Sequence, residues 1–198
     1  MDQFIPQAML DLLSYRSTLG QSLKQISLRK TPLEIILYDI AKYRSGYTDI
    51  LIQENLIGSR FKSEDSILRK YQKTLRTNGG FKQCFNDILG FRLHFDEYPK
   101  DFPAYFRVVD LRKGKLTDDG YHAIHLYYQR DSLSYPIEVQ LWCGTDYFFN
   151  LWSHKYIYKY KAPAVGQRLY QEFSQNIIQS EQDFLMRLQY WEATYHGE

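Results

Sequence analysis

The stretch Tyr135–Trp142, Y-P-I-E-V-Q-L-W, decides the fold that we expect for this chain. Its side chains alternate as in a β-strand, with Ile137, Val139 and Leu141 on one face and Glu138, Gln140 and Trp142 on the other. A carboxylate in the middle of a strand is costly to bury unless it meets a cation. Glu138 is therefore either on a solvent-facing surface or on the wall of a metal or substrate pocket.

Helical and strand patterns follow one another on both sides of this stretch. The patterns predict helices over 4–30, Pro32–Ile52, Ser63–Arg76, Asp146–Tyr160 and a long final helix from near Gln167, and strands over Asn55–Lys62, Asn86–Phe95, Tyr105–Leu111, Tyr121–Arg130 and Tyr135–Trp142. Thr31 to Glu34 resembles a capping box, and Ser63 a helix N-cap. The order predicts an α+β fold with a mixed sheet of about five strands and flanking helices.

The length of 198 residues predicts a single domain. Its expected parts are a helical N-terminal part at 1–53, a core at 54–160 and a C-terminal helix at 164–195. Cys84 and Cys143 lie far apart, which argues against a disulfide framework or a zinc site. The N-terminus lacks a signal peptide, and no apolar run is long enough for a membrane span, so we expect a cytoplasmic protein.

A net charge of only +2 requires any phosphate or nucleic-acid contact to come from local clusters of cations. One such cluster lies in R-F-K-S-E-D-S-I-L-R-K, residues 60–70. Arg60 and Lys62 share a strand face, and the first turn of the next helix offers free N–H groups beside them, with Lys70 further along. This arrangement suits a polyphosphate, although a solvated strand edge with a capped helix has the same pattern.

The segment D-I-L-G-F-R places a carboxylate and a guanidinium near one glycine. In a regular strand Asp87 and Arg92 would point to opposite faces. They can serve one pocket only if Gly90 marks a bulge or if Asp87 precedes the strand. Otherwise the segment is a core strand with polar ends.

In the segment G-Y-H-A-I-H, Tyr121 and His125 share one face of the predicted strand. A tyrosine beside a histidine suits stacking on a nucleobase, with the histidine reaching a phosphate or hydroxyl. A histidine satisfied within the core is the alternative. Strand parity separates His122 from His125, which argues against zinc.

These segments supply two carboxylates, Asp87 and Glu138, among several cations: Arg60, Lys62, Lys70, Arg92, Lys155 and Lys159. Two acids can hold Mg²⁺, and the cations can stabilise a transferring phosphoryl group. The sequence lacks a Walker loop, G-x-S-x-G and H-E-x-x-H. The pattern therefore favours ATP-type chemistry over protease or glycosidase chemistry.

Residues 55–160 resemble the synthetase domain of the RelA/SpoT family. The resemblance rests on four motifs in this order, R-F-K-S-E-D-S-I-L-R-K, D-I-L-G-F-R, G-Y-H-A-I-H and I-E-V-Q, followed by S-H-K-Y-I-Y-K. The resemblance implies a nucleotidyltransferase-like sheet and Mg²⁺-dependent transfer of the β,γ-pyrophosphate of ATP to a ribose 3′-hydroxyl. By position, Asp87 and Glu138 would hold the metal, and Glu138 would also help to deprotonate the hydroxyl.

The resemblance also implies roles for the residues around these acids. Arg60 and Arg92 would sandwich the adenine, and Lys62, Ser66 and Lys70 would hold the phosphates of ATP. Tyr121 would stack on the acceptor base, with His125, Gln140 and His154 lining the acceptor side.

Three departures from the family pattern bear on the acceptor. Trp142 stands where guanosine-nucleotide synthetases usually have an arginine, and Tyr147 and Ser153 where an asparagine and a glutamate are common. In this the chain is similar to toxic small synthetases, several of which pyrophosphorylate the 3′-CCA end of tRNA. The resemblance then implies a translation-inhibiting toxin restrained by an antitoxin protein or other regulator.

Two alternatives stay open: a small alarmone synthetase that makes (p)ppGpp from GTP or GDP, and an inactive nucleotide- or RNA-binding module. A tRNA substrate also needs cations for its phosphodiester arm. The candidates are Arg29, Lys30, Lys155, Lys159 and Lys161.

Overall fold

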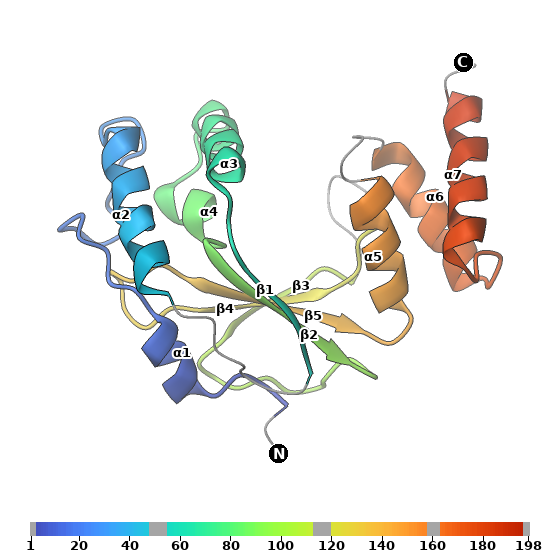
Figure 1. Ribbon diagram of the computed structural model, residues 1–198, viewed down its shortest axis with the longest axis horizontal. Coiled ribbons are helices and arrows are strands. Elements are labelled where there is room, and N and C mark those ends of the chain that lie inside the picture. The colour runs from blue at the N-terminus through green and yellow to red at the C-terminus, as the bar shows by residue number, and fades with distance from the viewer. Residues whose placement is uncertain (1–2, 48–54, 113–119, 158–162, 196–198) are drawn as a thin grey trace. The chain divides into compact units, whose positions relative to one another are not determined.

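The computed structural model describes residues 3–47, 55–112, 120–157 and 163–195 (Figure 1). Its elements are α1 (Gln7–Leu13), α2 (Leu33–Gly46), β1 (Leu56–Phe61), α3 (Glu64–Arg76), α4 (Phe81–Phe85), β2 (Leu89–Phe95), β3 (Arg107–Asp110), β4 (Ile124–Tyr128), β5 (Ile137–Cys143), α5 (Asp146–Tyr156), α6 (Pro163–Ser174) and α7 (Glu181–Tyr195). Every predicted strand is present, with ends shifted by at most three residues. The short helix α4 was not predicted.

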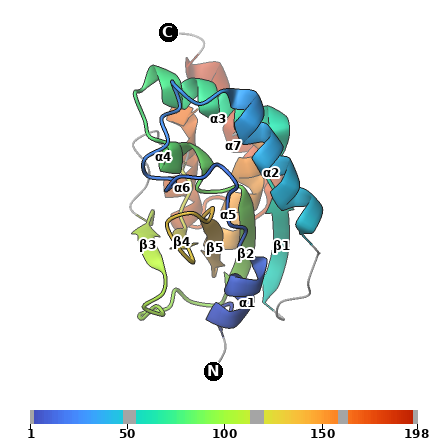
Figure 2. The same cartoon turned by 90° about the vertical axis from the view of Figure 1, so that its left-hand side faces the viewer.

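The five strands form one sheet in the order β1-β2-β5-β4-β3. Figure 2 shows this order across the sheet, from β1 on the right to β3 on the left. β1 and β2 are antiparallel. The arrowheads of β2 and β5 point the same way in Figure 1, so the sheet is mixed. The predicted α+β fold with a mixed five-stranded sheet is confirmed.

β5 is the central strand of the sheet and is buried on both faces. Ile137, Val139 and Leu141 have no exposed surface, and Glu138 is only 4% exposed. A solvent-facing position for Glu138 is therefore excluded.

The chain divides into two compact units. Unit 1 comprises Met1–Leu93, Pro99–Val108 and His125–Gln140, and unit 2 comprises His94–Tyr98, Val109–Ile124 and Leu141–Glu198. The expectation of one functional domain with parts at 1–53, 54–160 and 164–195 stays a prediction.

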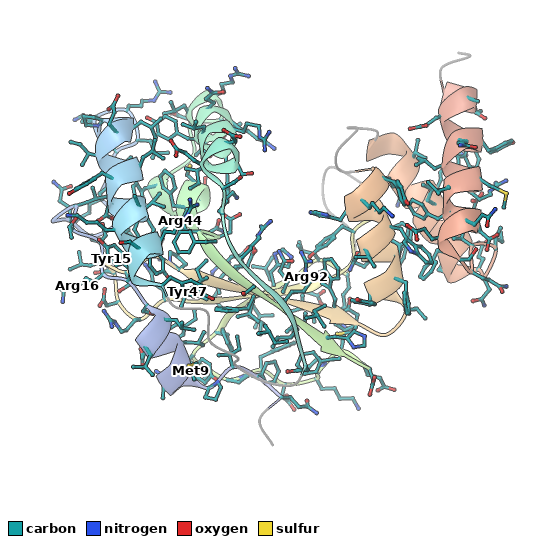
Figure 3. The ribbon with its side chains drawn as sticks, in the orientation of Figure 1. Met9, Tyr15, Arg16, Arg44, Tyr47 and Arg92 are labelled. Atoms are coloured by element: carbon teal, nitrogen blue, oxygen red, sulfur yellow. The ribbon has the colours of Figure 1, made fainter. Side chains whose placement is uncertain are left out.

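In unit 1 a buried carboxylate on α2 organises the N-terminal segment. Asp39 is 1% exposed and accepts hydrogen bonds from the hydroxyls of Tyr15 (3.0 Å) and Tyr135 (2.9 Å). It also accepts bonds from the hydroxyl of Ser17 (2.6 Å) and from the N–H and hydroxyl of Thr18 (both 2.8 Å). Figure 3 shows Tyr15 beside α2. These tertiary bonds hold the backbone after Leu13 out of a helix, so the predicted helix over 4–30 is wrong beyond α1.

The limits of α2 also differ from the prediction. The helix begins at Leu33, and Pro32 occupies the N-cap without a side-chain cap, so the predicted capping box at Thr31 is wrong. Tyr47 is extended, which ends the helix at Gly46. Residues 48–52 of the predicted helix lie outside the described residues. By contrast, Ser63 is the N-cap residue of α3, as predicted, although its side chain makes no capping bond.

Unit 2 is built on a core between three helices: Phe149 and Trp152 of α5, Leu169 of α6, and Phe184 and Leu188 of α7. The predicted single final helix is wrong, because α6 ends at Ser174 and α7 begins at Glu181. Asn176 has a φ of 59°, outside the helical region. Ile177, one of the apolar residues at helical spacing that predicted the single helix, is 53% exposed.

Within the described part of the chain, no helix is long and apolar enough to cross a bilayer.

Candidate active site

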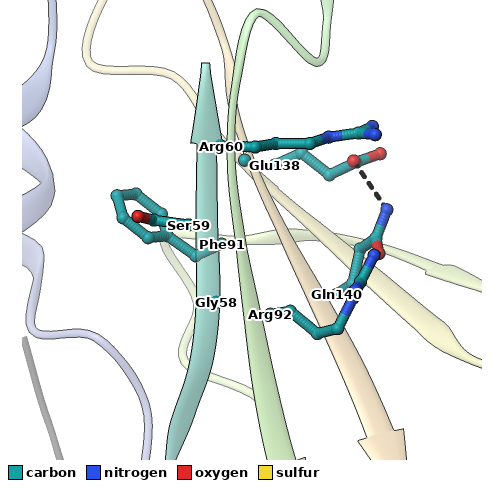
Figure 4. Close-up of a pocket in the computed structure, with 8 residues that line it drawn as sticks. Gly58, Ser59, Arg60, Phe91, Arg92, Glu138 and Gln140 are labelled. Carbon is teal, nitrogen blue, oxygen red and sulfur yellow. Dashed lines mark hydrogen bonds between the residues drawn. The ribbon is translucent and has the colours of Figure 1, made fainter. Parts of the chain in front are cut away.

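A pocket opens on one face of the strands of unit 1 (Figure 4). It contains about 310 Å³ of empty space, part of which is open to solvent, and its lining includes Arg60, Arg92, Glu138 and Gln140. Figure 4 shows these four side chains on one side of β1 and β2, whereas Ser59 and Phe91 point to the other side. Three of the four carry charge, so the pocket suits a polar ligand.

The register of β1 and β2 positions the two arginines. Arg60 lies opposite Gly90, and Gly58 lies opposite Arg92. The arginines are therefore diagonal neighbours on one face of the antiparallel pair. Diagonal neighbours of this kind are about 7–8 Å apart at the backbone. A flat ring held at about 3.5–4 Å from each of two planes needs the same 7–8 Å. This spacing is consistent with the predicted adenine sandwich.

Gly90 lies within this face but carries no bulge. The irregularity of the ladder falls between Leu56 and Gly58, and the pairing at Gly90 is regular. A Cβ atom at Gly90 would lie 3.7 Å from Glu138 Oε2 and 3.8 Å from Arg60 Nε. The glycine therefore forms the surface of the sheet between those two side chains.

Asp87 precedes β2, which is the second of the two arrangements that could bring it to the pocket side. It forms a salt bridge with Lys62, and Lys70 Nζ lies 2.8 Å from its Oδ1. Arg60 approaches its other oxygen at 4.0 Å. Burial lowers the pKa of Lys62, and the Asp87 carboxylate opposes that shift. The predicted phosphate-binding lysines are thus gathered around one buried carboxylate.

Glu138 is held by neutral donors and a histidine. Its Oε1 accepts a hydrogen bond from the Tyr127 hydroxyl at 2.9 Å and lies 3.2 Å from His125 Nδ1. Its Oε2 accepts a bond from Gln140 Nε2 at 2.9 Å. Burial alone would raise the pKa of Glu138, but the hydrogen bond and charge of His125, with the Tyr127 hydroxyl, lower it to about 2. The side chain is therefore a carboxylate at neutral pH.

Gln140 connects Glu138 to one of the arginines. Its Oε1 accepts bonds from Arg92 Nε and Nη2, both at 3.3 Å, while its Nε2 donates to Glu138. Gln140 and His125 were both predicted on the acceptor side, and each of them contacts the Glu138 carboxylate directly.

The donor chemistry of the two carboxylates fits Mg²⁺, which is usually bound by one or two carboxylates together with substrate phosphates and water. Among the described residues there is no cluster of three or more His, Cys, Asp or Glu side chains that could hold a metal. The oxygens of Asp87 contact two lysines. Asp87 can therefore bind a metal only if the lysines pair with phosphates of the substrate.

Neither Ser66 nor the described cations proposed for an RNA arm are among the residues that line this pocket. The Ser66 hydroxyl accepts bonds from Ser63 (2.9 Å) and Arg69 (3.2 Å) in the first part of α3. Arg29 donates to Asn78 Oδ1 at 3.0 Å and Lys30 is exposed. Lys155 forms a salt bridge with Glu181 at 2.8 Å. Lys159 and Lys161 lie outside the described residues.

Tyr121 and His154, the remaining predicted acceptor residues, belong to unit 2. The Tyr121 hydroxyl accepts a hydrogen bond from Trp142 Nε1 at 3.1 Å, and the two rings meet edge to face. Trp142 is 1% exposed, so it supports Tyr121 and does not itself offer a binding surface. His154 is exposed on α5.

Gly120, the first residue of the G-Y-H-A-I-H motif, is required by the backbone. Its φ is 71°, and a Cβ atom there would lie 2.4 Å from the carbonyl oxygen of Gly166.

Two residues near the carboxylates were missed from the sequence. Tyr127 follows His125 by two positions on β4, so the period of a strand could have placed it on the same face. Asn86, whose Oδ1 accepts a bond from Lys70 at 2.6 Å, precedes its strand and gives no such signal.

No family model and no curated protein matches this sequence. Among solved structures, the small alarmone synthetase 1 from Bacillus subtilis bound to its product pppGpp is 22% identical, with a TM-score of 0.43 over 72% of this chain and 84% of that one. A GTP pyrophosphokinase family protein from Streptococcus pneumoniae is 18% identical, with a TM-score of 0.38 over 73% and 83%. The small alarmone synthetase 2 from Bacillus subtilis is 21% identical, with a TM-score of 0.36 over 83% and 89%.

Proposed function

We propose that the chain is a Mg²⁺-dependent pyrophosphokinase that transfers the β,γ-pyrophosphate of ATP to a ribose 3′-hydroxyl. One observation carries the proposal: three of the four motifs supply unit 1 with two buried carboxylates, one among lysines and one beside a pocket with two diagonal arginines. Arg60 lines that pocket and also lies 4.0 Å from Asp87 Oδ2. The fold alone requires neither carboxylate, because apolar residues of similar volume can often replace a buried ion pair without loss of stability.

In the transfer, the 3′-oxygen forms a bond with the β-phosphorus of ATP, and the bond from that phosphorus to the bridging α-oxygen breaks. AMP leaves, and the hydroxyl proton goes to solvent or to a nearby base. Arg60 and Arg92 hold the adenine. Lys62 and Lys70 exchange their ion pairs with Asp87 for ion pairs with the phosphates of ATP. Bound Mg²⁺ would neutralise phosphate oxygens, with Asp87 and Glu138 as its protein ligands.

The low pKa of Glu138 favours a role in holding positive charge. A general base works best when its pKa lies near the operating pH. With a pKa of about 2, Glu138 is a weak proton acceptor but stays negatively charged throughout the neutral range. We therefore propose Glu138 as a metal ligand in preference to a general base that accepts the hydroxyl proton.

For the acceptor we propose the 3′-CCA end of tRNA, which would make the chain a translation-inhibiting toxin restrained by an antitoxin. A guanosine nucleotide brings its own phosphates and needs a dedicated cation, whereas Trp142 supplies a buried indole. An unpaired 3′-adenosine needs a stacking platform, and Tyr121 is anchored by that indole. The candidates for the RNA arm remain the same five cations, of which Arg29, Lys30 and Lys155 are exposed and Lys159 and Lys161 lie outside the described residues.

Isosteric changes at the two acids test the proposed reaction. We expect Asp87→Asn and Glu138→Gln to lower the rate of transfer from ATP by about 100-fold or more, because such electrostatic contributions are usually at least that large. The rate is measured with ATP labelled on the γ-phosphate, and a thermal melt of each variant reports whether it folds. A folded variant that keeps more than a tenth of the wild-type rate would contradict the two-acid role.

A further inference from the structure

We propose that Tyr127 is a positioning residue that fixes the orientation of the Glu138 carboxylate. The inference rests on the proposed function for its kinetic consequence, but its structural part stands on the geometry of unit 1. Neither the family motifs nor the pocket lining includes Tyr127.

The geometry starts from strand parity. His125 and Tyr127 are alternate residues of β4 and point to one face. β4 is the neighbour of β5, and both side chains reach the same oxygen of Glu138: the Tyr127 hydroxyl at 2.9 Å and His125 Nδ1 at 3.2 Å. His125 Nδ1 also lies 3.4 Å from the Tyr127 hydroxyl. The three groups form a compact triangle that defines the place of Oε1.

The other oxygen of Glu138 is held from the pocket side. Gln140 donates to Oε2 but also accepts two bonds from Arg92, which lines the pocket. A ligand that engages Arg92 therefore disturbs the Gln140 contact. The Tyr127 bond does not pass through Arg92, so it holds the carboxylate while the pocket fills.

The ring of Tyr127 is itself held in place. The Arg107 guanidinium lies 4.5 Å above the ring centroid, a cation–π contact at the exposed edge of β3. The positive charge over the ring draws electron density from the phenol, which strengthens its O–H as a donor to a carboxylate. Tyr127 is only partly buried, so the bond to Glu138 and the contact with Arg107 account for its orientation.

Removing the hydroxyl alone tests the proposal. Tyr127→Phe keeps the ring and its contact with Arg107 but deletes the bond to Glu138. We expect a fall in kcat of about 10-fold or more, the usual effect of losing a partner that orients a metal-holding side chain. The KM for ATP should change less than 2-fold, and calorimetry with a non-hydrolysable ATP analogue should show the same affinity as for the wild type.

Tyr128→Phe is the matched control, because the adjacent Tyr128 hydroxyl donates to Asp11 and not to Glu138. It should leave kcat unchanged, even if both variants melt at a slightly lower temperature. A wild-type kcat for Tyr127→Phe, or an equal loss in both variants, would overturn the proposal.

A crystal structure of the Tyr127→Phe variant gives a result that does not depend on activity. We expect the Glu138 carboxylate to have turned away from its wild-type place. A carboxylate that keeps the same orientation overturns the positioning role, whether or not the wild type transfers pyrophosphate. If the wild type transfers no label while the carboxylate does turn, the proposed function fails and the positioning of Glu138 stands.

Discussion

Asp87 and Glu138 keep their charge by different means, and their surroundings fit different tasks. Two lysines and a more distant arginine neutralise Asp87, and we propose that both lysines bind the phosphates of ATP. Glu138 is held by a tyrosine and a histidine of the adjacent strand β4 and by a glutamine of its own strand, β5. The first carboxylate is thus part of a cluster of paired charges, and the second is a negative charge held by hydrogen bonds on the wall of the pocket.

The low pKa of Glu138 predicts a dependence of stability on pH. Its pKa in the folded chain, about 2, lies below the ordinary value of 4.5, so the ionised side chain contributes stability above pH 4.5 that is lost as the pH falls toward 2. Between pH 6 and pH 3 the wild type should lose about 2 kcal/mol more free energy of unfolding than Glu138→Gln. Urea titrations at the two pH values measure this; equal losses would show that the pKa is not depressed.

We predict that ATP binding depends on the planar guanidinium of Arg92 and not on its positive charge alone. Arg92→Lys keeps the positive charge but loses the planar group that can stack on adenine and hold Gln140. We expect about 10-fold weaker ATP binding by calorimetry, whereas Arg112→Lys, an exposed arginine paired with Asp110, should bind as the wild type does. Unchanged affinity in Arg92→Lys would count against the adenine sandwich.

At the scale of elements, α7 depends on a reciprocal cap that its sequence displays. The Ser180 hydroxyl accepts a bond from the Asp183 N–H at 3.1 Å, and Asp183 Oδ2 accepts one from the Ser180 N–H at 3.0 Å. Ser180→Ala should therefore lower the free energy of unfolding by about 1 kcal/mol. Ser174→Ala, which removes only a bond to the Gln171 carbonyl near the end of α6, should cost less. Equal losses in chemical denaturation would argue against the cap.

The same cap shows what could be predicted among the elements. S-E-Q-D at 180–183 signals a helix start, but the apolar spacing from Leu169 to Trp191 ran across it and predicted one helix. The N-terminal segment gave no comparable signal. Its apolar spacing is helical, and only the distant Asp39, through Ser17 and Thr18, shows why the backbone leaves the helix. β5 was predictable because a strict two-residue alternation leaves little choice of structure.

At the scale of the whole molecule, the sequence allowed the pocket to be predicted better than the acceptor side. Arg60, Arg92, Glu138 and Gln140 lie on neighbouring strands with one parity, so strand periodicity brings them together. The partners of Asp87 could be expected from charge. The contacts of Glu138 with Tyr127 and of Tyr121 with Trp142 depend on which strands and loops become neighbours, and no local pattern encodes that.

The acceptor is tested most directly by following the label from the γ-phosphate of ATP. The chain is incubated with Mg²⁺, labelled ATP and either bulk tRNA or a mixture of GTP and GDP, and the products are separated by thin-layer chromatography and by gel. Asp87→Asn is the inactive control. We predict label in tRNA, lost when the 3′-terminal adenosine is removed. Label in guanosine tetra- or pentaphosphate with unlabelled tRNA would contradict the tRNA acceptor, and no transfer to either by the folded wild type would contradict the proposed reaction itself.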